Sequence, residues 1–161
     1  QRQMCIRDRI SRIRPFLWFD GQAQEAIEYY VSVFPNSSID QVVLYPDESL
    51  DRHFEGMTGK VLNGDFTLNG SPFGCLDGGP EFAFNESISF VIGCEDQAEI
   101  DHYWQALSAV PESEACGWCK DRFGVSWQVV PAGLDLLQQR PEQIQALMHM
   151  KKIVIAELEN A

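Results

Sequence analysis

The chain has 161 residues, 45% of them hydrophobic, and 24 acidic against 12 basic residues give it a net charge of -12. This length and apolar content suit one compact domain, or two small modules that share a core, and argue against a disordered chain. Since Lys and Arg form no cluster and the apolar runs are far too short to span a bilayer, we expect neither a nucleic-acid partner nor a membrane partner.

Residues 1–12 do not have the pattern of a folded segment. The first nine contain three of the 12 basic residues, show no apolar periodicity and resemble translated sequencing-adaptor sequence. We therefore expect 1–12 to be a disordered, non-native tail and place the start of the fold at residue 13. No charged region followed by an apolar one occurs at the start, so a cytoplasmic location is the expectation.

Residues 13–80 have the pattern of an α+β module. The expected elements in chain order are a strand at 15–20, a helix at 21–34, a strand at 38–45, a polar exposed loop at 46–59, and strands at 61–68 and 73–76. Apolar residues at spacings of three and four indicate the helix, and Pro35-Asn36-Ser37 ends it. Asn69-Gly70 is typical of a hairpin turn between the last two strands.

Residues 86–131 repeat this pattern at an offset of 74 residues. The matching pairs are Phe16 and Phe90, Glu25 and Glu99, and Tyr29-Tyr30 and Tyr103-Trp104. The expected elements are a strand at 87–94, a helix that ends near residue 109, and strands at 113–119 and 125–130. Asp96 and Glu99 have the spacing of a helix N-cap and its reciprocal partner. The duplication predicts an α+β fold built from two related modules.

Several blocks of the chain resemble one known group of proteins. The blocks are Pro15-Phe16-Leu17-Trp18-Phe19, Phe34-Pro35-Asn36-Ser37, Leu76-Asp77-Gly78-Gly79-Pro80, Phe84-Asn85-Glu86-Ser87 and Lys120-Asp121-Arg122-Phe123-Gly124. Together they are similar to the vicinal oxygen chelate superfamily, which contains glyoxalase I, extradiol dioxygenases and the bleomycin resistance proteins. Within it the chain most resembles the PhnB-like branch, often labelled 3-demethylubiquinone-9 3-methyltransferase.

The resemblance covers residues 13–159 and implies a single domain. It would consist of two βαβββ modules, at about 13–80 and 86–131, and C-terminal helices at about 134–159. In this superfamily each module curls a glyoxalase-like sheet around a cavity, and the helices lie outside. The resemblance also implies a homodimer and a small organic molecule as the partner.

A second implication of the resemblance concerns a metal ion. Metal-dependent members hold a divalent ion by His, Gln or Glu at four inward strand positions, which fall here on Pro15, Ser89, Gln128 and a position within 74–77. Only Cys75 or Asp77, together with Gln128, could donate from those positions. Since at most two of four ligands remain, we expect no metal and no cofactor, and a divalent metal is disfavoured rather than excluded.

Strand alternation then assigns a ligand site. If position 15 faces the cavity, alternate residues of that strand do so too, while Trp18 faces the helix. The predicted ligand-binding residues are Leu17, Phe19, Asp77, Ser89, Val91, Ser126 and Gln128, and no catalytic or metal-binding residue is assigned. This set is mostly apolar with a few polar groups, which is typical of sites for small organic ligands.

Two functions follow as hypotheses. The favoured one is a metal-independent protein that binds an apolar or aromatic small molecule in a strand-lined cavity. The alternative is a metal-dependent lyase, isomerase or dioxygenase-like enzyme with a degenerate site at Asp77 and Gln128. The methyltransferase label finds no support, because Gly78-Gly79-Pro80 follows a strand but opens no helix, as a nucleotide-binding loop would.

Overall fold

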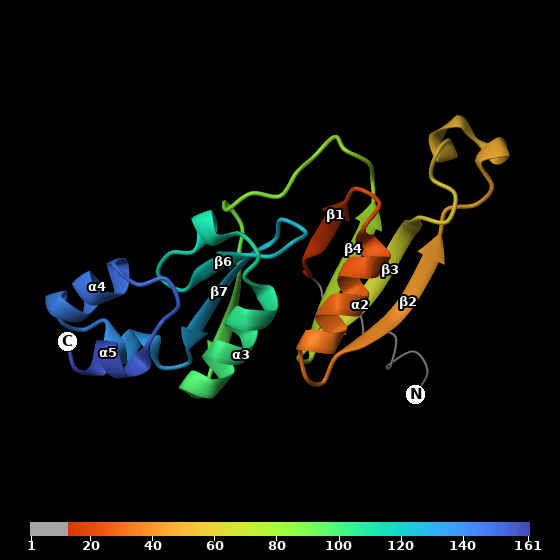
Figure 1. Cartoon of the computed structure of the whole chain (residues 1–161). Helices are drawn as coiled ribbons and strands as arrows, with labels where there is room; N and C mark the ends of the chain where they lie inside the picture. Colours follow the sequence, from red (N-terminus) through yellow and green to blue (C-terminus); the bar gives the residue numbers. More distant parts are fainter. Residues whose placement is uncertain (1–12) are drawn as a thin grey trace. The chain divides into compact units, whose positions relative to one another are not determined.

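The computed structural model describes residues 13–161, so the tail predicted for 1–12 lies outside the described part. The chain forms two compact units, the first ending at Ala83 and the second beginning at Phe84. Each unit combines a small sheet with a helix, which confirms the predicted α+β class (Figure 1). Among the helices of the described part, none is both long enough and apolar enough to cross a membrane.

Unit 1 is a four-stranded sheet with one helix on it. Its elements are β1 (Phe16–Phe19), α2 (Ala23–Val33), β2 (Ser38–Leu44), β3 (Val61–Leu68) and β4 (Ser71–Asp77), with two short 3-10 turns at Glu48–Leu50 and Arg52–Phe54. The strand order is β1-β4-β3-β2, with β1 parallel to β4 and the other pairs antiparallel. This order closely follows the elements predicted for 13–80.

Local sequence explains how α2 and the hairpin form. The buried residues of α2 are Ala23, Ala26, Ile27, Tyr30 and Val33, which fall on the face predicted from the periodicity. A side chain on Gly64 of β3 would come within 2.8 Å of the Cys75 sulfur and 3.7 Å of Ile27 Cδ1, so glycine lets the helix approach the sheet there. Asn69 and Gly70 both have positive φ (48° and 81°), as a tight hairpin turn requires.

Unit 2 has the number of strands predicted from its sequence pattern, one fewer than the βαβββ module that the family resemblance implied. Its elements are β5 (Phe90–Cys94), α3 (Gln97–Leu107), β6 (Trp118–Lys120) and β7 (Ser126–Pro131), in the order β5-β7-β6. Unit 2 therefore has three strands and no counterpart of β2. The reason lies in the segment between α3 and β6, where Pro111–Ser113 form a 3-10 turn and Cys116 and Gly117 have positive φ (53° and 85°). Such residues interrupt an extended strand, so the strand predicted at 113–119 shrinks to its end.

Side-chain capping fixes the ends of these elements. Glu99 N–H donates to Asp96 Oδ1 at 2.9 Å, which confirms the predicted N-cap of α3, while the Glu99 carboxylate accepts from the N–H of Glu95 rather than of Asp96. Before β5, Asn85 Oδ1 accepts from Ser87 N–H at 2.9 Å. That local turn competes with sheet pairing, so β5 begins at Phe90 instead of residue 87.

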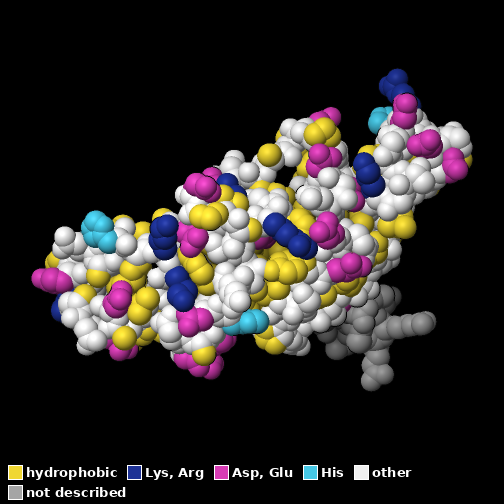
Figure 2. Space-filling model, viewed as in Figure 1, with side chains coloured by type: hydrophobic (Ala, Val, Ile, Leu, Met, Phe, Trp, Pro, Cys, Tyr) yellow, Lys and Arg dark blue, Asp and Glu magenta, His cyan; other side chains and the backbone are white. Residues whose placement is uncertain are grey.

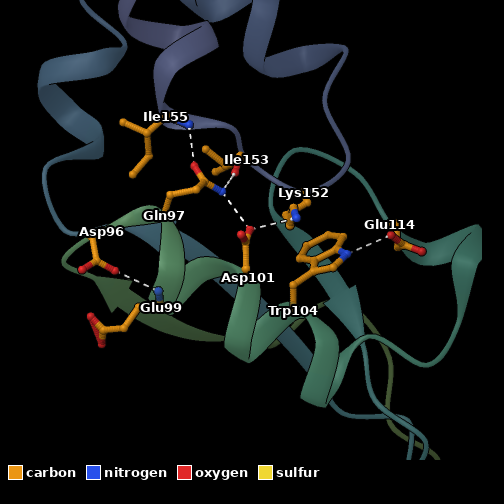
Figure 3. A network of polar contacts seen from close by, with 9 residues as sticks. All are labelled: Asp96, Gln97, Glu99, Asp101, Trp104, Glu114, Lys152, Ile153 and Ile155. Atoms are coloured by element: carbon orange, nitrogen blue, oxygen red, sulfur yellow. Dashed lines mark hydrogen bonds and ion pairs between the residues drawn. The ribbon is translucent and has the colours of Figure 1, made fainter.

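The C-terminal segment belongs to unit 2 and is attached to α3. It contains a 3-10 turn at Leu134–Leu137, α4 (Pro141–Met148) and α5 (Ile155–Glu159). Gln97 Nε2 donates to the Ile153 carbonyl at 3.0 Å, and Gln97 Oε1 accepts from Ile155 N–H at 2.9 Å (Figure 3). Lys152 pairs with Asp101 of α3 at 2.8 Å. These contacts join residues 152–155 to α3.

Candidate functional site

Each sheet has a face covered by its helix and a far face turned away from it. In unit 1, Leu17 is paired with Cys75 and Phe19 with Asp77, and register partners project from the same face. The Cys75 sulfur lies beside the position of Ile27 of α2, so this set of four faces the helix. Phe19 is accordingly 2% exposed, and all four side chains are buried.

The orientation predicted for β1 was therefore wrong by one residue. Phe16 and Trp18 lie on the far face, whereas Leu17 and Phe19 belong to the core under α2. Phe16 is 45% exposed. Alternation fixes which residues share a face but not which face meets the helix, so the assumption that position 15 faces the cavity turned the whole strand to the wrong side.

Asp77 does not point away from the helix either. Its Oδ1 accepts from Ala23 N–H at 2.9 Å and its Oδ2 accepts from Val61 N–H at 2.9 Å, and the residue is 1% exposed. Ala23 is the first residue of α2, where a negative charge is stabilised by the helix dipole. With both oxygens bonded to backbone N–H groups, Asp77 has a structural role and is not the ligand-binding or metal-binding residue that the sequence indicated.

The glycines that follow Asp77 serve an aromatic contact. A Cβ on Gly78 would overlap the ring of Trp18, and Trp18 Nε1 donates to the Gly79 carbonyl at 2.9 Å. Phe82 meets the same ring edge-on at 4.9 Å between centroids. Gly78 is thus needed for the packing of Trp18, while Gly79 has a φ of 94° and leads into an irregular segment. These residues therefore do not fit a nucleotide-binding loop for a methyl donor.

Polar groups on the far face of unit 1 are paired with one another. Arg14 donates to Asp65 Oδ1 at 2.7 Å and to the Phe73 carbonyl at 3.4 Å, and Asn63 Nδ2 donates to the same Asp65 oxygen at 3.4 Å. The guanidinium also lies over the Phe16 ring at 5.9 Å. This cluster was not predicted, although the alternation of Asn63, Asp65 and Thr67 along one strand is typical of a strand with one polar face.

Unit 2 places four predicted residues on one face. Cys94 of β5 is 1% exposed, and α3 packs on β5, so Cys94 lies on the face covered by the helix. Val91 stands three positions before Cys94 and therefore points to the opposite, far face of the sheet, where it is 62% exposed. Gln128 is the register partner of Val91, and Ser126 follows by alternation. Ser89 joins them, because Gln128 Nε2 donates to Ser89 Oγ at 2.9 Å.

Lys120 completes this far face and was not predicted. It is the register partner of Ser126, and its ammonium forms an ion pair with the Glu86 carboxylate. The hydrogen bond from Lys120 lowers the pKa of Glu86 below its ordinary value. Ser126 is 2% exposed, and its Oγ has no hydrogen-bond partner among the described residues. Lys120 belongs to the block at residues 120–124, which carries the family resemblance but no pattern that indicates a binding residue.

The neighbouring Asp121 has a structural role. Its Oδ1 accepts from Phe123 N–H at 2.9 Å and Val125 N–H at 3.0 Å, and its Oδ2 accepts from Trp127 Nε1 at 2.8 Å. The residue is buried. These three bonds hold the turn between β6 and β7 and thereby set the register that brings Lys120 and Ser126 side by side.

The donors present on the far faces do not fit a divalent metal. The far-face residues of the parallel pairs β1–β4 and β5–β7 are Phe16, Trp18, Gly74, Leu76, Val91, Ser126, Gln128 and Val130. Gln128 is the one strong donor in this set. Nowhere between residues 13 and 161 do three or more His, Cys, Asp or Glu side chains gather in a way that could hold an ion. Burial also raises the pKa of Cys75 to about 12, so that thiol is neutral and a poor ligand.

Comparisons with known proteins agree with this fold. The profile of the family described as 3-demethylubiquinone-9 3-methyltransferase matches residues 11–130. A PhnB protein of Bacillus cereus that carries the same methyltransferase name is 34% identical, over 74% of this chain and 99% of that one, with a TM-score of 0.62. A search of curated proteins gave no match.

Two more distant structures share the fold alone. Protein PA1353 of Pseudomonas aeruginosa is 19% identical over 76% of this chain and 98% of its own, with a TM-score of 0.56. The fosfomycin resistance protein FosX of Listeria monocytogenes is 12% identical over 81% and 98%, with a TM-score of 0.50. The profile match covers most of the chain, and the resemblance found in the sequence is confirmed. The chain belongs to the family described as 3-demethylubiquinone-9 3-methyltransferase, the PhnB-like branch of the vicinal oxygen chelate superfamily.

Proposed function

We propose that this protein binds a small organic molecule with an apolar or aromatic body on the far face of unit 2, and that it does so without a resident divalent ion. The observation that carries the proposal is the mixture of groups on that face. Val91 is largely exposed beside the linked amide and hydroxyl of Gln128 and Ser89. An apolar surface with a few placed polar groups is the usual composition of a small-molecule site.

The metal-dependent alternative has lost one of its two residues. It required Asp77 as a ligand, but both Asp77 oxygens accept backbone hydrogen bonds under α2. Gln128 would then stand alone, and a single neutral oxygen donor does not hold a divalent ion against water. A methyltransferase activity has no support either, because the Gly78-Gly79 pair packs under Trp18.

The acidic surface favours a ligand that is uncharged, or an anionic ligand whose charge is balanced by basic groups at the site itself. Acidic side chains are spread over the visible face of the molecule, with hydrophobic patches between them (Figure 2). Acidic surroundings repel anions at long range, so an anionic ligand would need basic or hydrogen-bonding groups at the site itself.

Binding is tested with a fragment set of neutral and charged aromatic compounds. Each compound is titrated into the purified protein with and without EDTA, and backbone amide shifts are followed by NMR. We expect shifts on β5 and β7 that survive EDTA. Val91→Glu should weaken binding at least tenfold, because it buries a charge against the ligand, whereas Leu50→Glu on the exposed 3-10 turn of unit 1 should not.

Two results would contradict the proposal. One is the loss of all binding in EDTA together with stoichiometric divalent metal in the purified protein. The other is the absence of any amide shift on β5 and β7 across the whole fragment set. A site for small organic molecules should bind at least some of the fragments at millimolar concentration.

A further inference from the structure

A row of hydrogen-bond donors crosses the far face of unit 2. Lys120 of β6 and Ser126 of β7 are register partners, and Phe90 pairs with Trp127, so Ser89 lies beside Ser126 on the opposite side. Side chains of register partners stand about 5 Å apart on one face of a sheet. Lys120, Ser126 and Ser89 therefore form one transverse row, and Gln128 stands in the next row.

Lys120, Ser126 and Ser89 can all donate hydrogen bonds to a ligand. Gln128 Nε2 donates to Ser89 Oγ at 2.9 Å, which leaves the Ser89 hydroxyl hydrogen to be donated elsewhere. Ser126 Oγ is buried and has no partner among residues 13–161. Buried hydroxyls are almost always hydrogen-bonded, so the unpartnered Ser126 hydroxyl indicates a missing partner. A carboxylate oxygen can accept from this hydroxyl and from the neighbouring Lys120 ammonium at the same time.

The carboxylate of Glu86 is the charged acceptor that pairs with this row in the part of the chain that the structure describes. It pairs with Lys120, whose side chain is 23% exposed, while the Glu86 side chain is 56% exposed. Glu86 lies in the irregular segment before β5, in which Phe84 lies near Gly124 of the β6–β7 turn. Lys120 thus stands on a strand, whereas the Glu86 carboxylate is more exposed and comes from an irregular segment. A ligand carboxylate could therefore take the place of Glu86 at Lys120.

From this arrangement we infer that Lys120, Ser126 and Ser89 form a subsite for the carboxylate group of the ligand, and that Glu86 occupies Lys120 when the ligand is absent. The inference rests on the proposed function, because it places the charged end of the ligand beside Val91 and Gln128. The row provides an ammonium and two hydroxyl donors for an anion, and hydrogen bonds from such groups to a carboxylate are strong when water is largely excluded. Glu86 acts as an internal competitor that dissociates from Lys120 as the ligand binds.

Benzoate is the probe, with benzamide as its neutral counterpart and inorganic phosphate as a second anion. Affinities are measured by NMR titration of the full chain at fixed ionic strength. We expect benzoate to bind at least tenfold more tightly than benzamide. Glu86→Gln should tighten benzoate binding several-fold, because the competitor is gone, and should leave benzamide unchanged. Ser126→Ala should weaken benzoate binding several-fold and benzamide little.

Two further variants separate charge from folding. Lys120→Met should weaken benzoate binding at least tenfold, and Lys120→Arg should retain most of the affinity. If a substitution at this position simply disrupted the fold, both variants would lose benzoate binding. Asp101→Asn is the matched control for Glu86→Gln. It likewise removes a carboxylate from an ion pair of unit 2, the pair between Asp101 of α3 and Lys152, which lies outside the proposed row. That variant should leave benzoate affinity unchanged.

The outcomes distinguish this inference from the proposed function. Equal affinities for benzoate and benzamide, or no tightening in Glu86→Gln, would overturn the carboxylate subsite while leaving small-molecule binding intact. Binding of phosphate but not benzoate through the same residues would overturn the choice of a carboxylate. If neither aromatic compound nor any neutral fragment shifts β5 and β7, the proposed function itself fails.

Discussion

The carboxylate of Asp77, at the end of the last strand of unit 1, accepts a hydrogen bond from the backbone N–H of Ala23, 54 residues earlier at the start of α2. Its second oxygen bonds Val61 N–H at the start of β3. One buried side chain therefore connects the first helix with two strands. This explains why a polar residue at a predicted site position belongs to the core of the module.

Asp77→Asn should destabilise the protein by about 3 kcal/mol, because the amide can accept only one of the two backbone hydrogen bonds and its NH₂ group opposes the other N–H. Urea unfolding followed by circular dichroism measures the loss. Asp135→Asn, at an exposed position in the C-terminal segment, should change stability by less than about 0.5 kcal/mol. Equal effects of the two variants would show that Asp77 is not the connecting group described here.

Gly78→Ala should cost about 1–3 kcal/mol, because the added methyl group overlaps the ring of Trp18 and forces one of them to move. The change should also alter the fluorescence of Trp18 and weaken its hydrogen bond to Gly79. Gly133→Ala is the control, since a Cβ there would meet its nearest neighbour at 3.9 Å. A Gly78 variant as stable as the wild type would mean that the aromatic contact does not require glycine.

The protein should lose stability as the pH rises from 9 towards 12. Burial and the charge of Asp77 raise the pKa of Cys75 to about 12, and burial likewise raises that of Cys119 to about 12. A thiol with a raised pKa binds its proton more tightly in the folded state, so its contribution is complete below pH 9 and disappears as pH approaches 12. Cys75→Ala should reduce the slope of urea midpoint against pH above pH 9. An unchanged slope in that variant would argue against burial of an unionised Cys75 thiol.

Gln97→Ala should loosen the C-terminal segment and reduce stability by about 1–2 kcal/mol, because two hydrogen bonds to the backbone of Ile153 and Ile155 are lost. Hydrogen exchange at Ile155 should become faster while exchange in β3 stays the same. Gln24→Ala is a matched control on α2, where the amide makes only an exposed bond to Glu28. Faster exchange in both variants alike would show a general loss of helix stability instead of a local anchor.

Much of the local structure could be predicted from the sequence. The apolar spacing of 21–34 gave α2 within two residues, Asn69-Gly70 gave the hairpin, and Asp96 gave the N-cap of α3. In each case the cause lies within a few neighbouring residues, such as helical periodicity, tolerance of positive φ or a side chain that caps the adjacent N–H groups. The family blocks likewise identified the superfamily.

The sequence alone therefore determined the α+β class, the duplication and the positions of most elements. Tertiary structure decided the face of β1 that meets α2, the shortening of the strand predicted at 113–119, the structural role of Asp77 and the pairing of Lys120 with Glu86. A strand has two equivalent faces until it packs against another element, and the contacts of Asp77 and Lys120 join residues 16 to 54 positions apart. Such contacts leave no local pattern, because their partners become neighbours only when the sheet has formed.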